Sequence, residues 1–228
     1  MQESVNDFRP GQADKLYIIT GGPGSGKSSL LSSLASKGYA VMPEAGRAII
    51  QDQKLIGGPA LPWADRKIFA ELMLSWELRS YRQAFSMMNG SKGDFEEKVG
   101  GDSASTRPRR WPITATTAEQ CPGWGPVFFD RGVPDVVGYL KLCGLEVPKH
   151  IMRAAKYFRY ARQVFFAPPW EKIYRNDDDR KQSWVEAVAT GQAMIDVYSS
   201  LGYEICHLPL ASVEERADYV LNCHANSW

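Results

Sequence analysis

The 228-residue sequence predicts an α/β fold, in which a five-stranded, mostly parallel sheet lies between two layers of helices. Short apolar runs have the length and composition of buried strands, and the first of them ends in a glycine-rich turn. Amphipathic helical stretches alternate with these runs, and parallel strands need the crossover connections that such helices supply. The runs predicted as strands are residues 16–19, 39–42, 127–129, 164–167 and 203–208.

Apolar residues that recur on one face identify the helical stretches. The longest stretch is residues 64–88, where Phe69, Leu72, Met73 and Trp76 follow the i, i+3, i+4, i+7 spacing of a core-facing stripe. The other helices are predicted at residues 27–37, 45–56, 134–143, 181–201 and 212–223.

One domain is expected over residues 15–224, because a chain of this length buries enough surface to fold without a metal or a disulfide. Residues 1–14 are polar and are predicted to be a flexible tail. Residues 89–125 are rich in Gly, Ser, Thr and Pro and show no apolar period, which predicts an inserted, disordered loop.

The formal net charge of +1 gives no broad field that would attract nucleic acid or an anionic membrane. A local site for a small molecule is expected instead. The four cysteines form no C-x-x-C pair and are predicted to be reduced, and no apolar run has the length of a membrane span. The composition therefore predicts a cytoplasmic monomer or homodimer without membrane insertion.

The strongest signal is a match to G-x-x-x-x-G-K-[ST] between a predicted strand and a predicted helix, the context that this phosphate-binding motif requires. Its backbone N–H groups and the positive end of the helix dipole are suited to the phosphates of ATP. Lys27 would add a charge at the β- and γ-phosphates, and the Ser28 hydroxyl would bind Mg²⁺. An ordinary glycine-rich turn is the plain alternative. With the neighbouring Ser29, the predicted ATP site is Gly21, Gly22, Pro23, Gly24, Ser25, Gly26, Lys27, Ser28 and Ser29.

Ligands of open parallel sheets bind outside the carboxyl ends of the strands, so the polar residues that follow the predicted strands are candidates for the same site. Asp130 follows three apolar residues and resembles a Walker B acid that holds Mg²⁺. A helix-capping role for Asp130 is the alternative. Arg131 offers a planar fork of donors for a phosphate or an acceptor, or else pairs with Asp130 or Glu44.

Glu44 follows the second predicted strand, where a carboxylate would act as general base on an acceptor hydroxyl. The alternative is a first-turn Glu that favours the helix dipole. Arg175 and Arg180 flank an acidic stretch after the fourth strand, and they would neutralise the transferred phosphoryl group from a lid. A solvated charged turn is the alternative there.

Some further residues are weaker candidates. Asp135, Arg47 and Arg66 are possible parts of an acceptor site, whereas His150 and His207 are expected to be structural.

Four strings together resemble the bacterial AAA-type P-loop ATP-binding proteins with a domain similar to the NadR ribosylnicotinamide kinase. They are the glycine-rich motif and the segments Pro-Glu-Ala-Gly-Arg at 43–47, Asp-Arg-Gly-Val-Pro-Asp at 130–135 and Ala-Pro-Pro-Trp-Glu at 167–171. More distantly, the pattern is similar to that of deoxynucleoside and thymidylate kinases. That resemblance implies that Glu44 is the base, that Arg131 touches the acceptor and that the nucleotide base lies beside residues 209–212. The insertion at 89–125 departs from the family pattern.

Three kinds of function suit a P-loop protein. The favoured one is a Mg-dependent phosphotransferase that moves the γ-phosphate of ATP to a hydroxyl of a nucleoside-like or other small metabolite. The alternative is a nucleotide-dependent switch or ATPase module without an acceptor. A ring-forming mechanical ATPase is disfavoured, because Arg131 stands where such enzymes place a water-activating Glu.

Overall fold

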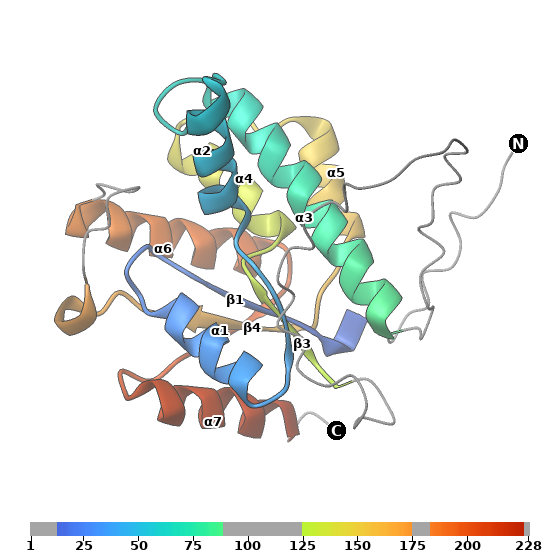
Figure 1. Ribbon diagram of the computed structural model, residues 1–228, viewed down its shortest axis with the longest axis vertical. Coiled ribbons are helices and arrows are strands. Elements are labelled where there is room, and N and C mark those ends of the chain that lie inside the picture. The colour runs from blue at the N-terminus through green and yellow to red at the C-terminus, as the bar shows by residue number, and fades with distance from the viewer. Residues whose placement is uncertain (1–12, 89–124, 175–182, 226–228) are drawn as a thin grey trace, which may run out of the picture.

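The computed structural model describes residues 13–88, 125–174 and 183–225 (Figure 1). Its centre is a five-stranded sheet in the order β2-β3-β1-β4-β5. Every neighbouring pair in this sheet is parallel. The strands are β1 (Leu16–Gly21), β2 (Ala40–Met42), β3 (Val127–Asp130), β4 (Gln163–Ala167) and β5 (Glu204–His207).

Helices cover both faces of the sheet (Figure 1). The α-helices of the described segments are α1 (Lys27–Ser36), α2 (Ala45–Ile56), α3 (Arg66–Met88), α4 (Val133–Leu142), α5 (Lys149–Tyr157), α6 (Trp184–Ser200) and α7 (Val213–Ala225). Two short 3-10 helices, η1 (Ala13–Lys15) and η2 (Glu171–Ile173), precede β1 and follow β4. The predicted three-layer α/β/α fold is confirmed.

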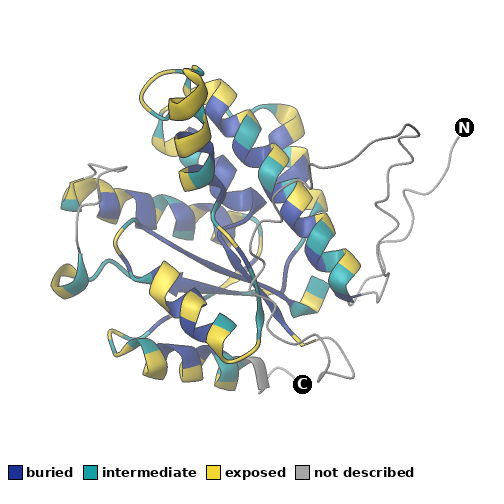
Figure 2. Ribbon diagram, viewed as in Figure 1, coloured by how far each residue is buried: buried dark blue, intermediate teal, exposed yellow. Residues whose placement is uncertain are grey.

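The side chains of β1 alternate between two hydrophobic cores, as the pleat of a strand requires. Tyr17 and Ile19 pack with α1 and α7, whereas Leu16 and Ile18 pack with the larger helical layer that contains α3, α4 and α6. Both sets are buried because the strand is central, and Figure 2 shows β1 buried along its whole length. This double burial explains why the strand reads as a continuous apolar run rather than an alternating one.

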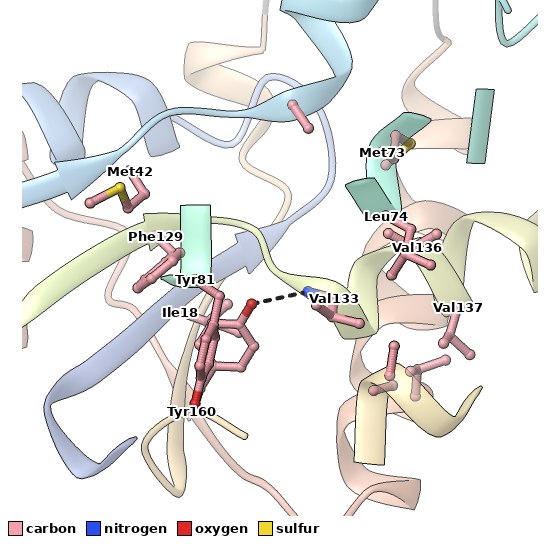
Figure 3. Close-up of a cluster of buried hydrophobic side chains, with 14 of the residues drawn as sticks. Ile18, Met42, Met73, Leu74, Tyr81, Phe129, Val133, Val136, Val137 and Tyr160 are labelled. Carbon is pink, nitrogen blue, oxygen red and sulfur yellow. Dashed lines mark hydrogen bonds between the residues drawn. The ribbon is translucent and has the colours of Figure 1, made fainter. Parts of the chain in front are cut away.

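The larger core contains three aromatic side chains in edge-to-face contact (Figure 3). The ring centroid of Tyr160 lies 5.1 Å from that of Tyr81 and 5.2 Å from that of Phe129. The Tyr160 hydroxyl accepts a hydrogen bond of 3.3 Å from the backbone N–H of Val133, at the start of α4. The core therefore holds α4 at the end of β3, beside the candidate site.

The predicted elements are present, and their ends differ from the prediction by at most two residues where both ends are described. The main omission in the prediction is α5, whose buried residues Ile151, Ala154 and Ala155 make a stripe too short and too small to stand out. The buried face of α3 is also rotated from the predicted stripe: Phe69 and Met73 are buried, but Trp76 is only partly so, and Glu77 lies inward.

Parts of three predictions fall outside the described residues. They are the tail as far as residue 12, the insertion from 89 to 124 and residues 181–182 at the start of the predicted fifth helix. Within the described segments, no helix is both long enough and apolar enough to span a membrane.

Shortening one buried side chain tests the smaller core. Leu34 of α1 is fully buried between α1 and the sheet, so Leu34→Ala is expected to lower the free energy of unfolding by about 2–5 kcal/mol. Leu55→Ala is the matched control, because Leu55 is 85% exposed, and it should change the unfolding free energy by less than about 0.5 kcal/mol. Urea unfolding measures both, and equal losses would contradict the packing described.

Candidate functional site

The glycine-rich motif joins the end of β1 to the start of α1, as predicted. The Lys27 ammonium lies inside the loop, where it donates hydrogen bonds to the backbone carbonyls of Gly22 at 2.7 Å and Gly21 at 3.2 Å. It also lies 3.3 Å from the Ser25 hydroxyl, which itself donates to the Gly22 carbonyl at 2.8 Å. These neutral groups help to hold the cation at the centre of the loop.

The loop also packs closely against α6. A Cβ atom added at Gly22 would lie 2.3 Å from the carbonyl oxygen of Ala187, a distance that the two backbones cannot accommodate. Only glycine permits this approach of the loop to α6. The path of the loop is thus determined by its neighbours as well as by the helix that follows it.

Asp130 is the last residue of β3 and is 6% exposed. Burial raises the pKa of its carboxyl group to about 6, and the Glu44 carboxylate adds to this effect, while Lys27 and Arg131 oppose it. Its Oδ1 atom is buried without a hydrogen-bond partner. The capping alternative does not hold, because α4 begins after Gly132, whose backbone N–H is bound by Asp135 instead.

Arg131 is the one described residue other than glycine with a positive φ, at 76°. This uncommon conformation for a bulky side chain turns it into the interior of the protein. Its Nε donates to Glu44 and its Nη1 to Asp135, both at 3.1 Å. Burial alone would lower the pKa of Arg131, but the surrounding carboxylates outweigh it and raise the pKa above its usual value. The ion pair weighed as an alternative for Arg131 is therefore present.

Glu44 is the N-terminal capping residue of α2, but its side chain makes no capping hydrogen bond there. The carboxylate instead reaches Arg131, with both side chains largely buried. The position next to the helix end agrees with the dipole alternative, and the side-chain direction agrees with a place in the site.

Asp135 is 1% exposed and accepts hydrogen bonds from several elements. The donors besides Arg131 are the Thr20 hydroxyl of β1 at 2.6 Å, the Gly132 N–H at 3.0 Å and the Tyr198 hydroxyl of α6 at 2.5 Å. Asp135 therefore links β1, α4 and α6 through its carboxylate, and its part in an acceptor site stays a prediction.

Glu77 of α3 is a site residue that the sequence analysis missed. It is 3% exposed, and no hydrogen bond to its carboxyl group occurs in the part of the chain that the structure describes. Desolvation raises its pKa well above the usual value, and the carboxylates of Asp135 and Asp130 raise it further. The available signal was its spacing, since Glu77 lies four residues after Met73 on the buried face of the helix.

The remaining candidates are less central. Ser28 and Ser29 start α1 and are exposed, and so are Arg47 and Arg66. The exposed His150 has its Nε2 2.9 Å from the Glu71 Oε1, and His207 packs against the Phe166 ring. Arg175 and Arg180 lie outside the described residues.

A protein family described as an AAA domain matches residues 16–92 and 113–216, well over half of the chain. The chain belongs to this AAA-domain family. No curated protein matches the sequence. Two solved structures show the fold of this AAA-domain protein at low sequence identity.

The first is NadR in complex with NR, with a TM-score of 0.56 and 14% identity over 92% of this AAA-domain protein. The chain spans half the length of that NadR chain. The second is deoxyadenosine kinase from M. mycoides with its products bound, with a TM-score of 0.53, 11% identity and coverage of 93% of this chain and 100% of that one. The predicted resemblance and the P-loop kinase-like fold are confirmed.

The buried Glu77 carboxyl predicts a pH-dependent stability. When the pKa of a carboxyl group is higher in the folded protein than in the unfolded protein, the folded protein loses stability as the pH rises. The reason is that the group must then ionise while it is buried. Glu77→Gln keeps the shape without the charge. The variant is therefore expected to gain stability relative to the wild type as the pH rises above 4.5, the ordinary pKa of a glutamate.

The measurement is urea unfolding of both proteins across this pH range. Glu146→Gln is the control, because Glu146 is exposed, and its difference from the wild type should stay near zero. A difference between Glu77→Gln and the wild type that does not vary with pH would show that Glu77 is not a buried acid.

Proposed function

We propose that this AAA-domain protein is a magnesium-dependent phosphotransferase that moves the γ-phosphate of ATP to a hydroxyl of a nucleoside-like or other small metabolite. The observation that carries the proposal is the meeting of two sets of residues at the carboxyl end of the sheet. Lys27 lies in the phosphate loop. Its charge lowers the pKa of Asp130, which is also affected by the charges of Glu44 and Arg131. In this proposal the phosphate loop, Asp130 as the metal-binding acid and Glu44 as the base act on one ligand.

The phosphates of ATP would bind to the backbone N–H groups of the loop, with Lys27 exchanging its carbonyl partners for the β- and γ-phosphate oxygens. The glycines and the dipole of α1 favour an anion in the same place. These interactions position the γ-phosphate at the edge where β3 and β2 end.

The residues present suit a magnesium ion. The buried Oδ1 of Asp130 lacks a hydrogen-bond partner, and Ser28 begins the first turn of α1. Mg²⁺ commonly binds through one or two protein side chains together with substrate phosphates and water. When bound, Mg²⁺ would neutralise charge on the phosphates.

Glu44 is proposed as the general base. In the transfer step, the acceptor hydroxyl oxygen forms a bond to the γ-phosphorus, the bond from that phosphorus to the β,γ-bridging oxygen breaks, and ADP leaves. The hydroxyl proton goes to Glu44. Arg131 would contact the acceptor while its links to Glu44 and Asp135 keep the base in place.

The names of the two structural relatives support a nucleoside-like acceptor. One is NadR bound to NR, and the other is a deoxyadenosine kinase with nucleotide products. A contribution of Arg175 and Arg180 to charge neutralisation remains a prediction, as do a cytoplasmic location and the monomeric or dimeric state.

The direct test is ADP formation from Mg-ATP in the presence of a panel of nucleosides and related metabolites. Phosphotransfer predicts that at least one acceptor raises ADP formation and yields a phosphorylated product in the same amount. Equal ADP formation with and without every acceptor would favour the ATPase or switch alternative.

Replacement of the proposed base should separate chemistry from nucleotide binding. Glu44→Gln is expected to lower kcat by about 10²–10⁴-fold while the affinity for Mg-ATP stays near that of the wild type. Arg131 keeps its Asp135 partner in this variant, so the local structure is expected to remain. Steady-state kinetics and calorimetry measure the two effects.

Asp52→Asn is the matched control, because Asp52 is an exposed acid on the same helix, α2. This variant should transfer phosphate at the wild-type rate. A Glu44→Gln protein with unchanged kcat would remove Glu44 from the base role.

A further inference from the structure

A buried arginine of α7 lies directly against the phosphate loop. Arg216 is 2% exposed, and its Nη2 donates a hydrogen bond of 3.1 Å to the backbone carbonyl of Ser25. Helix α7 runs beside α1 on one face of the sheet (Figure 1). The last helix of the chain thus places a guanidinium group behind the loop near the start of the chain.

Arg216 has no carboxylate partner among the described residues. Its pKa is lowered by burial, and no charged neighbour contributes to the shift. Its Nε is buried without a hydrogen-bond acceptor. The contrast with Arg131 is informative, because Arg131 is also buried but is paired with two carboxylates.

Acids lie beside Arg216 in the sequence, yet each is engaged elsewhere. Glu214 and Asp218 pair with Lys37, the exposed residue that caps the end of α1, at 3.2 Å and 3.4 Å. Glu215 accepts hydrogen bonds from the backbone N–H and the hydroxyl of Ser212, at the start of α7. The fold therefore turns the three neighbouring acids outward and leaves the buried arginine without a counter-charge among the described residues.

Such an arrangement is unfavourable for stability alone. A buried charge without a counter-charge is costly to desolvate, and an apolar side chain of similar volume commonly replaces a buried charged group without loss of stability. An anion that binds nearby would neutralise the charge. The place where anions are expected is the loop that Arg216 touches.

The contact also affects the backbone of the loop. In a planar trans peptide the C=O and N–H groups point in opposite directions, so a donor that holds the Ser25 carbonyl directs the Gly26 N–H away from Arg216 and toward the other side of the loop. A Cβ atom at Gly26 would lie 2.7 Å from Nη1 of Arg216. The guanidinium group thus lies against the last peptides before Lys27.

We propose that Arg216 is a positioning residue for the polyphosphate: it orients the Ser25–Gly26 peptide and supplies a buried positive charge that is neutralised when a nucleoside triphosphate occupies the loop. The inference rests on the proposed nucleotide binding but not on the identity of the acceptor or on phosphotransfer. Because the bound anion neutralises Arg216, nucleotide binding to the loop would also stabilise the packing of α7 against it.

Two substitutions remove the charge while filling the site in different ways. Arg216→Met keeps an apolar chain of similar length, whereas Arg216→Gln keeps a shorter polar chain whose amide ends at the position of the arginine Nε; both lose the Nη2 that donates to Ser25. Both are expected to weaken Mg-ATP binding by about tenfold or more, the loss expected for a charged contact. The ligand-free unfolding temperature of the Gln variant is expected to equal or exceed that of the wild type, because an unneutralised buried charge has been removed.

Lys37→Met is the matched control, since Lys37 is an exposed cation that links the same two helices. It should leave the dissociation constant for Mg-ATP unchanged. Calorimetry gives the dissociation constants, and thermal unfolding with and without Mg-ATP gives the stabilities. If Arg216→Met fails to fold, Arg216→Gln carries the test.

A merely structural arginine predicts the opposite result: a lower unfolding temperature without ligand and a wild-type dissociation constant for the folded variant. That outcome in Arg216→Gln would overturn the proposal. Failure of the proposed function gives a different result. In that case the wild-type protein binds Mg-ATP but transfers no phosphate, and the Arg216 variants are still expected to bind Mg-ATP more weakly.

Discussion

The candidate site depends on the hydrogen bonds that the Asp135 carboxylate accepts. One buried side chain receives donors from β1, from the turn after β3 and from α6. These elements are far apart in the sequence, and the link holds the end of β1, where the phosphate loop begins, beside the end of β3, where Asp130 and Arg131 lie. Because each donor is buried, losing the common acceptor would leave several polar groups unsatisfied, and a substitution there would disturb the whole site.

The charges around this link explain the chemistry that the site favours. Carboxyl groups from β3, α2, α3 and α4 outnumber the buried cations Lys27 and Arg131, and burial raises the pKa of both Asp130 and Glu77. A bound magnesium ion would favour the ionised form of Asp130, whereas burial opposes ionisation of Glu77. A bound polyphosphate would in turn balance the positive charges of two cations that contact the loop, Lys27 and Arg216.

The sequence predicted the parts of the site that follow from local patterns. The glycine-rich motif and the residues that end β2 and β3 were found because a parallel sheet gathers the carboxyl ends of its strands at one edge. The pairing of Arg131 with Glu44 was one of two alternatives, and sequence could not decide between them because it depends on a positive φ at Arg131.

Other parts depend on tertiary packing and were not predicted. Glu77 lies in the site because the buried face of α3 is rotated from the apolar stripe that the sequence predicts. Arg216 lies in an acidic stretch of α7 that reads as a solvated helix, and its contact with Ser25 joins residues 191 positions apart. Short α5 was missed because its buried face is mostly alanine.

The central claim is that the loop after β1 binds a nucleoside triphosphate through its backbone N–H groups and Lys27. Isothermal titration calorimetry of the folded protein with Mg-ATP tests it most directly, with Lys27→Ala as the comparison. The account predicts saturable binding by the wild type and a large loss of affinity in the variant. An absence of binding by folded wild-type protein to Mg-ATP and to other magnesium nucleoside triphosphates, or equal affinity in Lys27→Ala, would contradict it.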